Sequence, residues 1–336
     1  MIQQAIRTLL EGRSLTSGGA EAVMGEIMEG RATPAQIAGL VIALRAKGET
    51  VNEVAGFARA MRERVAKVVP PAGVIADTCG TGGDGTHTLN ISTAAALVAA
   101  GAGVTVAKHG NRAMSSRCGS ADVLAALGVK IDVEPPVVER CLRETGIAFF
   151  FAQVFHPAMK HAGPPRRELG VRTIFNLLGP LTNPAGASAQ LIGVAAGELL
   201  ALEAGALAVL GTGHSLVVHG RDGSDELTVT ASTKAVEVRG HRVVRRLELN
   251  ARSFGFRRAK LADLAGGTPD ENADAIRQVL GGKQGAFRDA TLYNAGFVCW
   301  LAGLVRSPRL GMEAAARSVD TGAALGKLHQ LQEAMR

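Results

Sequence analysis

The sequence GTGGDG at residues 80–85 lies between a short apolar run, residues 74–76, and an Ala-rich run, residues 93–100. This order predicts a strand, a glycine-rich turn and a helix of an α/β fold. Residues 85–121 contain no Asp or Glu. The basic and imidazole side chains of that stretch are His87, Lys108, His109, Arg112 and Arg117. Bare backbone N–H groups at a helix N-terminus, in a cationic segment, are typical of a phosphate-binding site.

Two well-known phosphate-binding motifs do not match this loop. A dinucleotide-binding fold has the same glycine spacing but needs an acidic residue roughly 20 positions later, and the next predicted strand ends in basic Lys108 and His109 instead. A P-loop needs Lys and then Ser or Thr after its second glycine, where Thr86 and His87 stand. A simple turn would leave the acid-free stretch unexplained. The loop therefore predicts phosphate binding of another kind.

Two further polar clusters follow the loop. Residues 90–93, with the sequence NIST, open the Ala-rich helix; capping needs only one polar side chain, so the others are candidate ligands for phosphate or a metal. Residues 108–112, with the sequence KHGNR, follow the next predicted strand, and Ser115 and Ser116 come shortly after them. A solvated basic turn is the alternative. Because open α/β sheets bind ligands at the carboxyl ends of their strands, we favour a binding site.

The sequence GRDGSDE at residues 220–226 supplies an acidic counterpart after another predicted strand. Adjacent carboxylates such as Asp225 and Glu226 suit a Mg²⁺ ion that accompanies a polyphosphate, although such a pair is more often only part of a turn. His156 and Arg166 are weaker candidates on spacing alone. A lone His is more often structural than functional, and an Arg can bind a carboxylate through two hydrogen bonds.

The composition is that of an ordinary globular protein. The chain has 336 residues, 47% hydrophobic and 20% charged, which is enough for about two domains. Its four cysteines include no C-x-x-C pair, which favours reduced thiols over a disulfide scaffold or a zinc site. No apolar run is long enough to span a bilayer and no secretion signal is evident. We therefore expect a cytoplasmic protein with no membrane partner.

The net charge of +7 raises nucleic-acid binding as an alternative, because arginines are dense in residues 239–258. Valines and leucines alternate with these charges, as they do in a half-exposed strand. We interpret the run as the solvated face of a hairpin and expect no nucleic-acid partner.

The first 70 residues predict a bundle of short helices. The predicted helices are residues 2–10, residues 20–28 and two that begin at capping boxes at Thr33 and Thr50. In the third helix Ile37, Leu40 and Leu44 share one apolar face, while Ile42 and Ala43 point away from it. Because a short bundle cannot bury both faces by itself, this pattern predicts a homodimer through the helical domain.

Beyond residue 72, short apolar runs alternate with helical ones, which predicts a mostly parallel sheet. The predicted strands are residues 74–78, 104–107, 148–152, 191–194, 206–210 and 216–219, with helices that begin near Ser92, Ser120 and Pro136. Residues 165–188 interrupt this pattern and are helix-like. The predicted fold class is α/β: a small all-helical domain, residues 1–70 joined by 165–188, and a larger α/β domain with a mostly parallel central sheet, residues 72–164 and 189–336.

Together these motifs resemble the anthranilate phosphoribosyltransferase family of tryptophan biosynthesis. The resemblance is dense at residues 77–128, 156–184 and 220–226, and it covers nearly the whole chain. It implies a small helical domain hinged to a larger α/β domain, and usually a homodimer. It also implies two small-molecule substrates, with transfer of a phosphoribosyl group from 5-phosphoribosyl-1-pyrophosphate to the amine of anthranilate.

The resemblance further implies the residues of the site. Those expected to hold the phosphoribosyl pyrophosphate are Gly80, Gly83, Asp84, Thr88, Asn90, Ile91, Ser92, Thr93, Lys108, His109, Gly110, Asn111, Arg112, Ala113, Met114, Ser115, Ser116 and Ser120. Those expected near anthranilate are Gly80, Asn111, His156 and Arg166, with Arg166 facing the carboxylate. The Mg²⁺ ligands are expected to be Ser92, Asp225 and Glu226.

In such a reaction the amine displaces pyrophosphate at the anomeric carbon, through a transition state with oxocarbenium character. Positioning of the substrates, and charge stabilisation by Mg²⁺, Lys108, Arg112 and backbone N–H groups, would do most of the work. His109 is a candidate acceptor for the late proton, and no residue is a conventional nucleophile. Two alternatives stay open: a nucleoside phosphorylase, which would not need Asp225 and Glu226, and a nucleic-acid-binding relative of the same fold.

Overall fold

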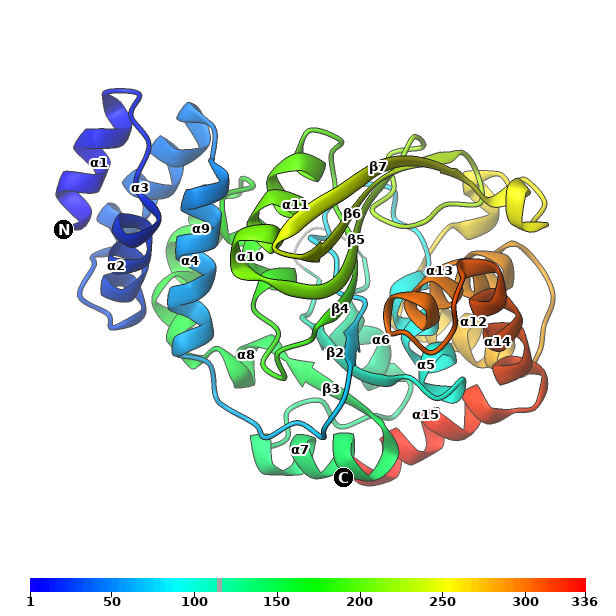
Figure 1. Ribbon diagram of the computed structural model, residues 1–336. Coiled ribbons are helices and arrows are strands. Elements are labelled where there is room, and N and C mark those ends of the chain that lie inside the picture. Colours follow the sequence, from blue (N-terminus) through cyan, green and yellow to red (C-terminus); the bar gives the residue numbers. More distant parts are fainter. Residues whose placement is uncertain (114–116) are drawn as a thin grey trace.

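The computed structural model describes residues 1–113 and 117–336 and has two parts (Figure 1). The helical part consists of α1 (Ile2–Leu10), α2 (Ser17–Met28), α3 (Pro34–Lys47) and α4 (Val51–Glu63). From the middle of the chain, α9 (Gly163–Leu169) packs against α3, and α10 (Phe175–Leu181) packs against α4. The rest of the chain forms a larger α/β part. The predicted fold class is confirmed.

One sheet of seven strands forms the centre of the α/β part, in the order β3-β2-β1-β4-β5-β6-β7. The strands are β1 (Ile75–Asp77), β2 (Thr105–Gly110), β3 (Ile147–Phe151), β4 (Ala189–Gly193), β5 (Thr212–Gly220), β6 (Ser232–Gly240) and β7 (Arg242–Asn250). The strands β1 to β5 are parallel, and β6 and β7 add an antiparallel hairpin at one edge. The sheet is mostly parallel, as predicted, so β1, β2 and β4 end at the same edge.

Helices cover both faces of this sheet. They are α5 (Ile91–Gly101), α6 (Ser120–Ala126), α7 (Pro135–Thr145), α8 (Ala152–Phe155), α11 (Leu199–Leu210), α12 (Pro269–Leu280), α13 (Ala286–Leu301), α14 (Pro308–Asp320) and α15 (Ala323–Ala334), with 3₁₀ turns at Pro157–His161, Ala251–Phe254 and Leu261–Leu264. Leu191 and Leu216 belong to the hydrophobic cluster of α5 and α13, whereas Ile192 and Val217 belong to the cluster of α11 and the helical part. Adjacent residues of a strand point to opposite faces, so the two clusters lie on opposite sides of the sheet.

The prediction of a strand at residues 206–210 is wrong, because these residues are the last turn of α11. The helix is built mainly from Ala and Leu, which are strong helix formers, and Gly211 ends it with φ 81°. A short apolar run does not by itself distinguish a strand from a buried helix segment. The other five predicted strands overlap β1 to β5, and residues 239–258 include the predicted hairpin strand as β7.

The capping boxes at Thr33 and Thr50 are both present. In α3, Ile42 is 40% exposed, but Ala43 is only 7% exposed and packs in the helical core, against the prediction of an outward position. Ile42 therefore faces solvent without Ala43 beside it.

Within the described residues, no helix has both the length and the apolarity that a membrane crossing needs. The hydrophobic cluster of the helical part continues into α11 and the sheet, so the division into residues 1–70 with 165–188 and 72–164 with 189–336 stays a prediction.

Candidate functional site

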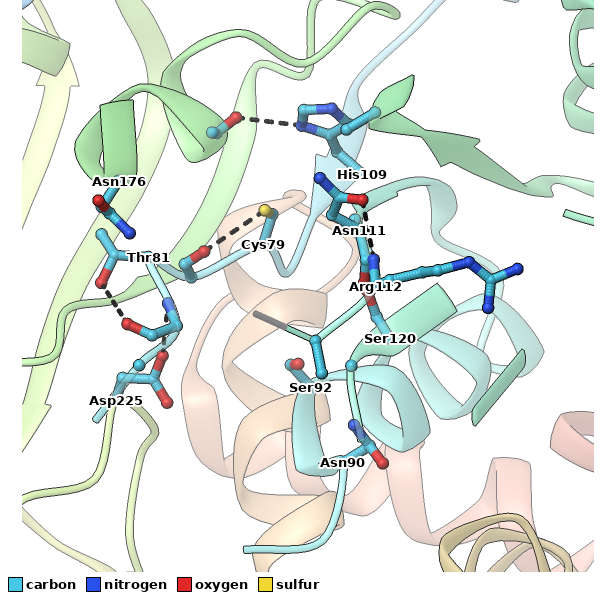
Figure 2. Close-up of a pocket in the computed structure, with 18 of the residues that line it drawn as sticks. Cys79, Thr81, Asn90, Ser92, His109, Asn111, Arg112, Ser120, Asn176 and Asp225 are labelled. Carbon is cyan, nitrogen blue, oxygen red and sulfur yellow. Dashed lines mark hydrogen bonds between the residues drawn. The ribbon is translucent and has the colours of Figure 1, made fainter. Parts of the chain in front are cut away.

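A cavity of about 410 Å³ lies at the carboxyl ends of β1, β2 and β3, with walls from both parts of the molecule (Figure 2). The predicted site residues that line it are Gly80, Gly83, Asp84, Thr88, Asn90, Ser92, Lys108, His109, Gly110, Asn111, Arg112, Ala113, Ser120, His156, Arg166, Asp225 and Glu226. Ile91 and Thr93 do not line it, and both are almost fully buried in the first turn of α5. Met114, Ser115 and Ser116 lie outside the described residues. The binding roles of all these residues stay predictions.

The glycine-rich loop presents free backbone donors. Its Thr81 N–H donates to the carbonyl of Gly193 at 2.8 Å, and its Gly82 N–H donates to Asp225 Oδ2 at 3.0 Å. The N–H groups of Gly80, Gly83, Asp84 and Gly85 donate to no group in the described part of the chain. Gly82 and Gly83 have φ values of 64° and 71°. Both values lie in the left-handed region, which glycine adopts without a steric cost.

The loop that carries Asp225 and Glu226 passes close to Gly193, the last residue of β4. A Cβ atom on Gly193 would lie 1.5 Å from the Asp225 carbonyl oxygen, so only glycine allows this approach. Asp225 N–H donates to Asp84 Oδ2 at 3.2 Å, and Ser92 N–H donates to Glu226 Oε1 at 3.0 Å. The structure thus brings the acid pair to the glycine loop and the start of α5, although more than a hundred positions separate the acid pair from both in the sequence.

The three carboxyl groups repel one another. Loss of solvent, and then the charge of Asp84, raises the pKa of Asp225 to about 7. Loss of solvent and the charge of Asp225 raise the pKa of Glu226 well above its usual range. A divalent cation would relieve this repulsion, and carboxylate oxygens are the ligands that Mg²⁺ prefers. Asp225 and Glu226 therefore fit a magnesium ion on their chemistry.

The cations of the cavity differ in their pairing. Lys108 is 4% exposed and has no acidic partner among the described residues. Arg112 is paired with Asp122 at 3.0 Å. The Arg166 guanidinium lies 5.1 Å from the centre of the Phe175 ring. Burial lowers the pKa of Arg166 from its usual value, but an arginine stays charged at neutral pH. An anion that enters the cavity therefore meets positive charge on more than one wall.

Two neutral histidines form another wall. His109 Nδ1 lies 3.0 Å from the Gly179 carbonyl oxygen, an acceptor, so Nδ1 carries the proton (Figure 2). Its Nε2 atom then carries a lone pair and can accept a hydrogen bond. This atom is buried and has no hydrogen-bond partner among the described groups. The His156 ring centre is 5.2 Å away. Burial lowers the pKa of His109 to about 4 and that of His156 to about 3. At pH 7 both rings are neutral, and His109 offers an acceptor.

Sequence reasoning missed Asp77, which organises the floor of the site. It is fully buried, and its carboxylate accepts hydrogen bonds from the N–H groups of Cys79 and His109 and from Asn183 Nδ2. Ligand atoms of Asp77, Cys79 and His109 lie within 4.8 Å of one another, and the Asp77 carboxylate already accepts three hydrogen bonds from the protein. An Asp at the end of a buried strand, three residues before Gly80, was the available signal.

Sequence reasoning also missed Arg172. It follows α9, and its side chain donates to two carbonyl oxygens of the glycine loop, those of Gly82 and Gly83. No local motif marks this residue, because its partners lie about 90 positions away.

Sequence profiles of two domains match the chain. The helical bundle domain of the glycosyl transferase family matches residues 3–65, and the a/b domain of that family matches residues 72–325. Among curated relatives, the anthranilate phosphoribosyltransferase of Pelotomaculum thermopropionicum is 51% identical over 99% of this chain and 96% of its own. The enzyme of the same name from Anaeromyxobacter sp. (strain K) is 54% identical over 98% of each chain.

Solved structures agree with these relatives. The anthranilate phosphoribosyltransferase of Thermus thermophilus superposes with a TM-score of 0.94 at 45% identity and covers 99% of both chains. The Saccharomyces cerevisiae enzyme in complex with PRPP and Mg superposes with a TM-score of 0.91 at 27% identity and covers 99% of this chain and 97% of its own. The same yeast enzyme has also been solved in complex with 4-fluoroanthranilate.

Proposed function

The chain belongs to the anthranilate phosphoribosyltransferase family, and from this premise we propose that it transfers the phosphoribosyl group of 5-phosphoribosyl-1-pyrophosphate to the amine of anthranilate. The products are N-(5-phosphoribosyl)anthranilate and pyrophosphate, and the reaction belongs to tryptophan biosynthesis. The observation that carries this proposal is one cavity that combines free amide donors, the acid pair Asp225 and Glu226, and Lys108, which forms no ion pair within the described residues. A pyrophosphate with its metal needs all three.

Asp225 and Glu226, with Ser92 beside them, would hold Mg²⁺. When bound, the ion neutralises charge on the pyrophosphate as it leaves. The N–H groups of Gly80, Gly83 and Asp84 bind its oxygens, and Lys108 contributes a charge close to the same oxygens. These donors are held by the fold before the substrate arrives, so no reorganisation is needed at the moment of reaction.

On the acceptor side, Arg166 binds the carboxylate of anthranilate and His156 packs beside the ring. This fixes the amine near the anomeric carbon, and the main rate advantage comes from that positioning. The attacking amine is neutral, so attack needs no base. The proton is lost after the new C–N bond forms, when the nitrogen is positively charged and strongly acidic. The free Nε2 of His109 can then accept it even with a pKa of about 4.

The protein also forms a homodimer through its helical part in this proposal. Leu10 of α1 is 75% exposed and Ile42 of α3 is 40% exposed, and α1 packs against α3. Exposed large apolar side chains on neighbouring helices favour an interface between copies. Light scattering at micromolar concentration should give twice the chain mass, and Ile42→Glu should reduce it; a monomer mass with full activity would contradict this.

One assay tests the proposed function directly. Anthranilate is fluorescent, so its consumption with 5-phosphoribosyl-1-pyrophosphate can be followed with and without Mg²⁺. We expect consumption only when the sugar pyrophosphate and Mg²⁺ are both present. Metal-independent phosphorolysis of a nucleoside, with anthranilate left intact, would favour the phosphorylase alternative.

A further inference from the structure

Arg172 joins the helical part to the glycine-rich loop. It lies between α9 and α10, and its Nη1 atom donates to the carbonyl oxygen of Gly82 at 2.7 Å and to that of Gly83 at 2.9 Å. Its other terminal nitrogen, Nη2, is buried and has no hydrogen-bond partner in residues 1–113 and 117–336. Arg172 also lines the cavity.

The two carbonyls that Arg172 binds fix two of the free amides. In a trans peptide the C=O and N–H bonds point in opposite directions. The Gly82 carbonyl shares its peptide unit with the Gly83 N–H, and the Gly83 carbonyl shares its unit with the Asp84 N–H. Both N–H groups lack an acceptor in the described protein. Arg172 therefore sets the direction of two donors that it does not touch.

Glycine makes this external contact necessary. Gly82 and Gly83 both have positive φ, and glycine reaches positive and negative φ with similar ease. Two successive glycines can therefore rotate their peptide units at low cost unless something outside the loop holds them. Arg172 holds both carbonyls at once, through the single nitrogen Nη1 of its guanidinium.

We propose that Arg172 is a positioning residue for the pyrophosphate, which orients the N–H groups of Gly83 and Asp84 toward one phosphate group. Because Arg172 belongs to the segment that packs with the helical part, it also makes anion binding by the loop depend on how that part is docked. This inference rests on the proposed function. The alternative is that Arg172 acts only through its positive charge, because the carboxylates of Asp84 and Asp225 interact electrostatically with its guanidinium.

The test measures the affinity of the full chain for inorganic pyrophosphate with Mg²⁺ by calorimetry. Arg172→Met should weaken it by roughly tenfold, the effect of losing one charge-assisted contact. Arg172→Lys keeps the charge but loses the planar guanidinium whose Nη1 reaches both carbonyls, so it should restore only part of the affinity. Arg167→Met is the matched control, because Arg167 is exposed on α9 and should leave the affinity unchanged.

Kinetics and hydrogen exchange separate positioning from folding. In Arg172→Met the KM for the sugar pyrophosphate should rise about tenfold while the KM for anthranilate stays constant. Amide exchange in residues 78–90 should increase, with the exchange of the helical part unchanged. Should Arg172→Met fail to fold, the pyrophosphate affinity of Arg172→Lys tests the inference by itself.

Three results would overturn the inference: full affinity in Arg172→Met, full recovery in Arg172→Lys, or a rise confined to the KM for anthranilate. A failure of the proposed function looks different. In that case the wild-type chain binds pyrophosphate in an Arg172-dependent way but does not consume anthranilate.

Discussion

The cavity at the carboxyl ends of the strands and the β6–β7 hairpin are both rich in positive charge, but their charges are paired differently. In the hairpin, Arg239 and Arg245 both donate to the buried carboxylate of Glu237, at 2.9 Å and 2.6 Å. In the cavity, Lys108 forms no ion pair in the described part of the chain, and the loop amides of Gly80, Gly83 and Asp84 have no acceptor there. Net charge in the sequence marks both regions. Unmatched donors in an enclosed space distinguish a binding site from a stabilised surface.

The largest effect should follow from removing the acid pair. Asp225→Asn with Glu226→Gln keeps the size of both side chains but removes the charges proposed to hold Mg²⁺, so kcat/KM should fall at least about a hundredfold. The Gly82 and Ser92 N–H groups keep an oxygen acceptor in this variant, so the fold should survive. Circular dichroism checks the fold. Normal turnover with unchanged Mg²⁺ dependence would show that the cavity does not use this metal site.

Arg166 tests whether the cavity has a separate acceptor side. Arg166→Ala removes a bidentate contact to the carboxylate of anthranilate, and its loss costs about 1.5–3 kcal/mol, or roughly ten- to a hundredfold in the KM for anthranilate. The KM for the sugar pyrophosphate should change little. Arg167→Ala, one position along the same helix, controls for charge. A change in the KM for the sugar pyrophosphate alone would mean that the two substrate sides are assigned the wrong way round.

The sequence predicted the regions of the site better than the contacts between them. Glycine, cap and charge patterns are local, so the loop at residues 80–85 and the start of α5 could be located from the sequence. Gly193 and Arg172 act on residues that are far from them in the sequence, and no local pattern contains that information. Residues 206–210 failed for a different reason, since burial of the whole run hides the difference between a strand and a helix. Successive side chains of a helix point in different directions, so Ser92 lines the cavity while its neighbours Ile91 and Thr93 are buried.

The hairpin pairing should matter for stability and not for catalysis. Glu237 is 1% exposed and also contacts His214 Nε2 at 2.9 Å, and the hydrogen bonds from Arg245 and its neighbours hold the pKa of its carboxyl low. Glu237→Gln should lower the free energy of unfolding by about 1–3 kcal/mol while kcat/KM stays constant. Chemical denaturation measures this. A large loss of activity in a folded Glu237→Gln variant would end the distinction between the two regions.

Glu203 on α11 is the opposite case, a buried glutamate with no hydrogen-bond partner in the described structure. Both of its carboxyl oxygens lack a hydrogen bond among the described residues, and burial raises its pKa well above the usual 4.5. The folded state therefore favours the protonated form, so stability is full below about pH 4.5 and is lost as pH rises toward the folded pKa. Glu203→Gln removes this loss and should stabilise the protein by about 1 kcal/mol or more at pH 8, with little effect at pH 4.5. Equal effects at both pH values would show that the carboxyl is already satisfied.

The smallest effect should come from the hairpin arginines that have no acidic partner in the described chain, Arg242 and Arg246. Both side chains are exposed, so water solvates their charges and hydrogen-bonds their N–H groups. No donor is then left for a ligand to bind. Arg242→Gln with Arg246→Gln should therefore change kcat/KM by less than about twofold, because screening at physiological salt removes most of their field at the cavity. A DNA mobility-shift assay with wild-type protein is the companion measurement. Salt-sensitive binding that the double variant abolishes would place a second binding site on this hairpin, because neutralised phosphate contacts reduce the salt dependence of binding.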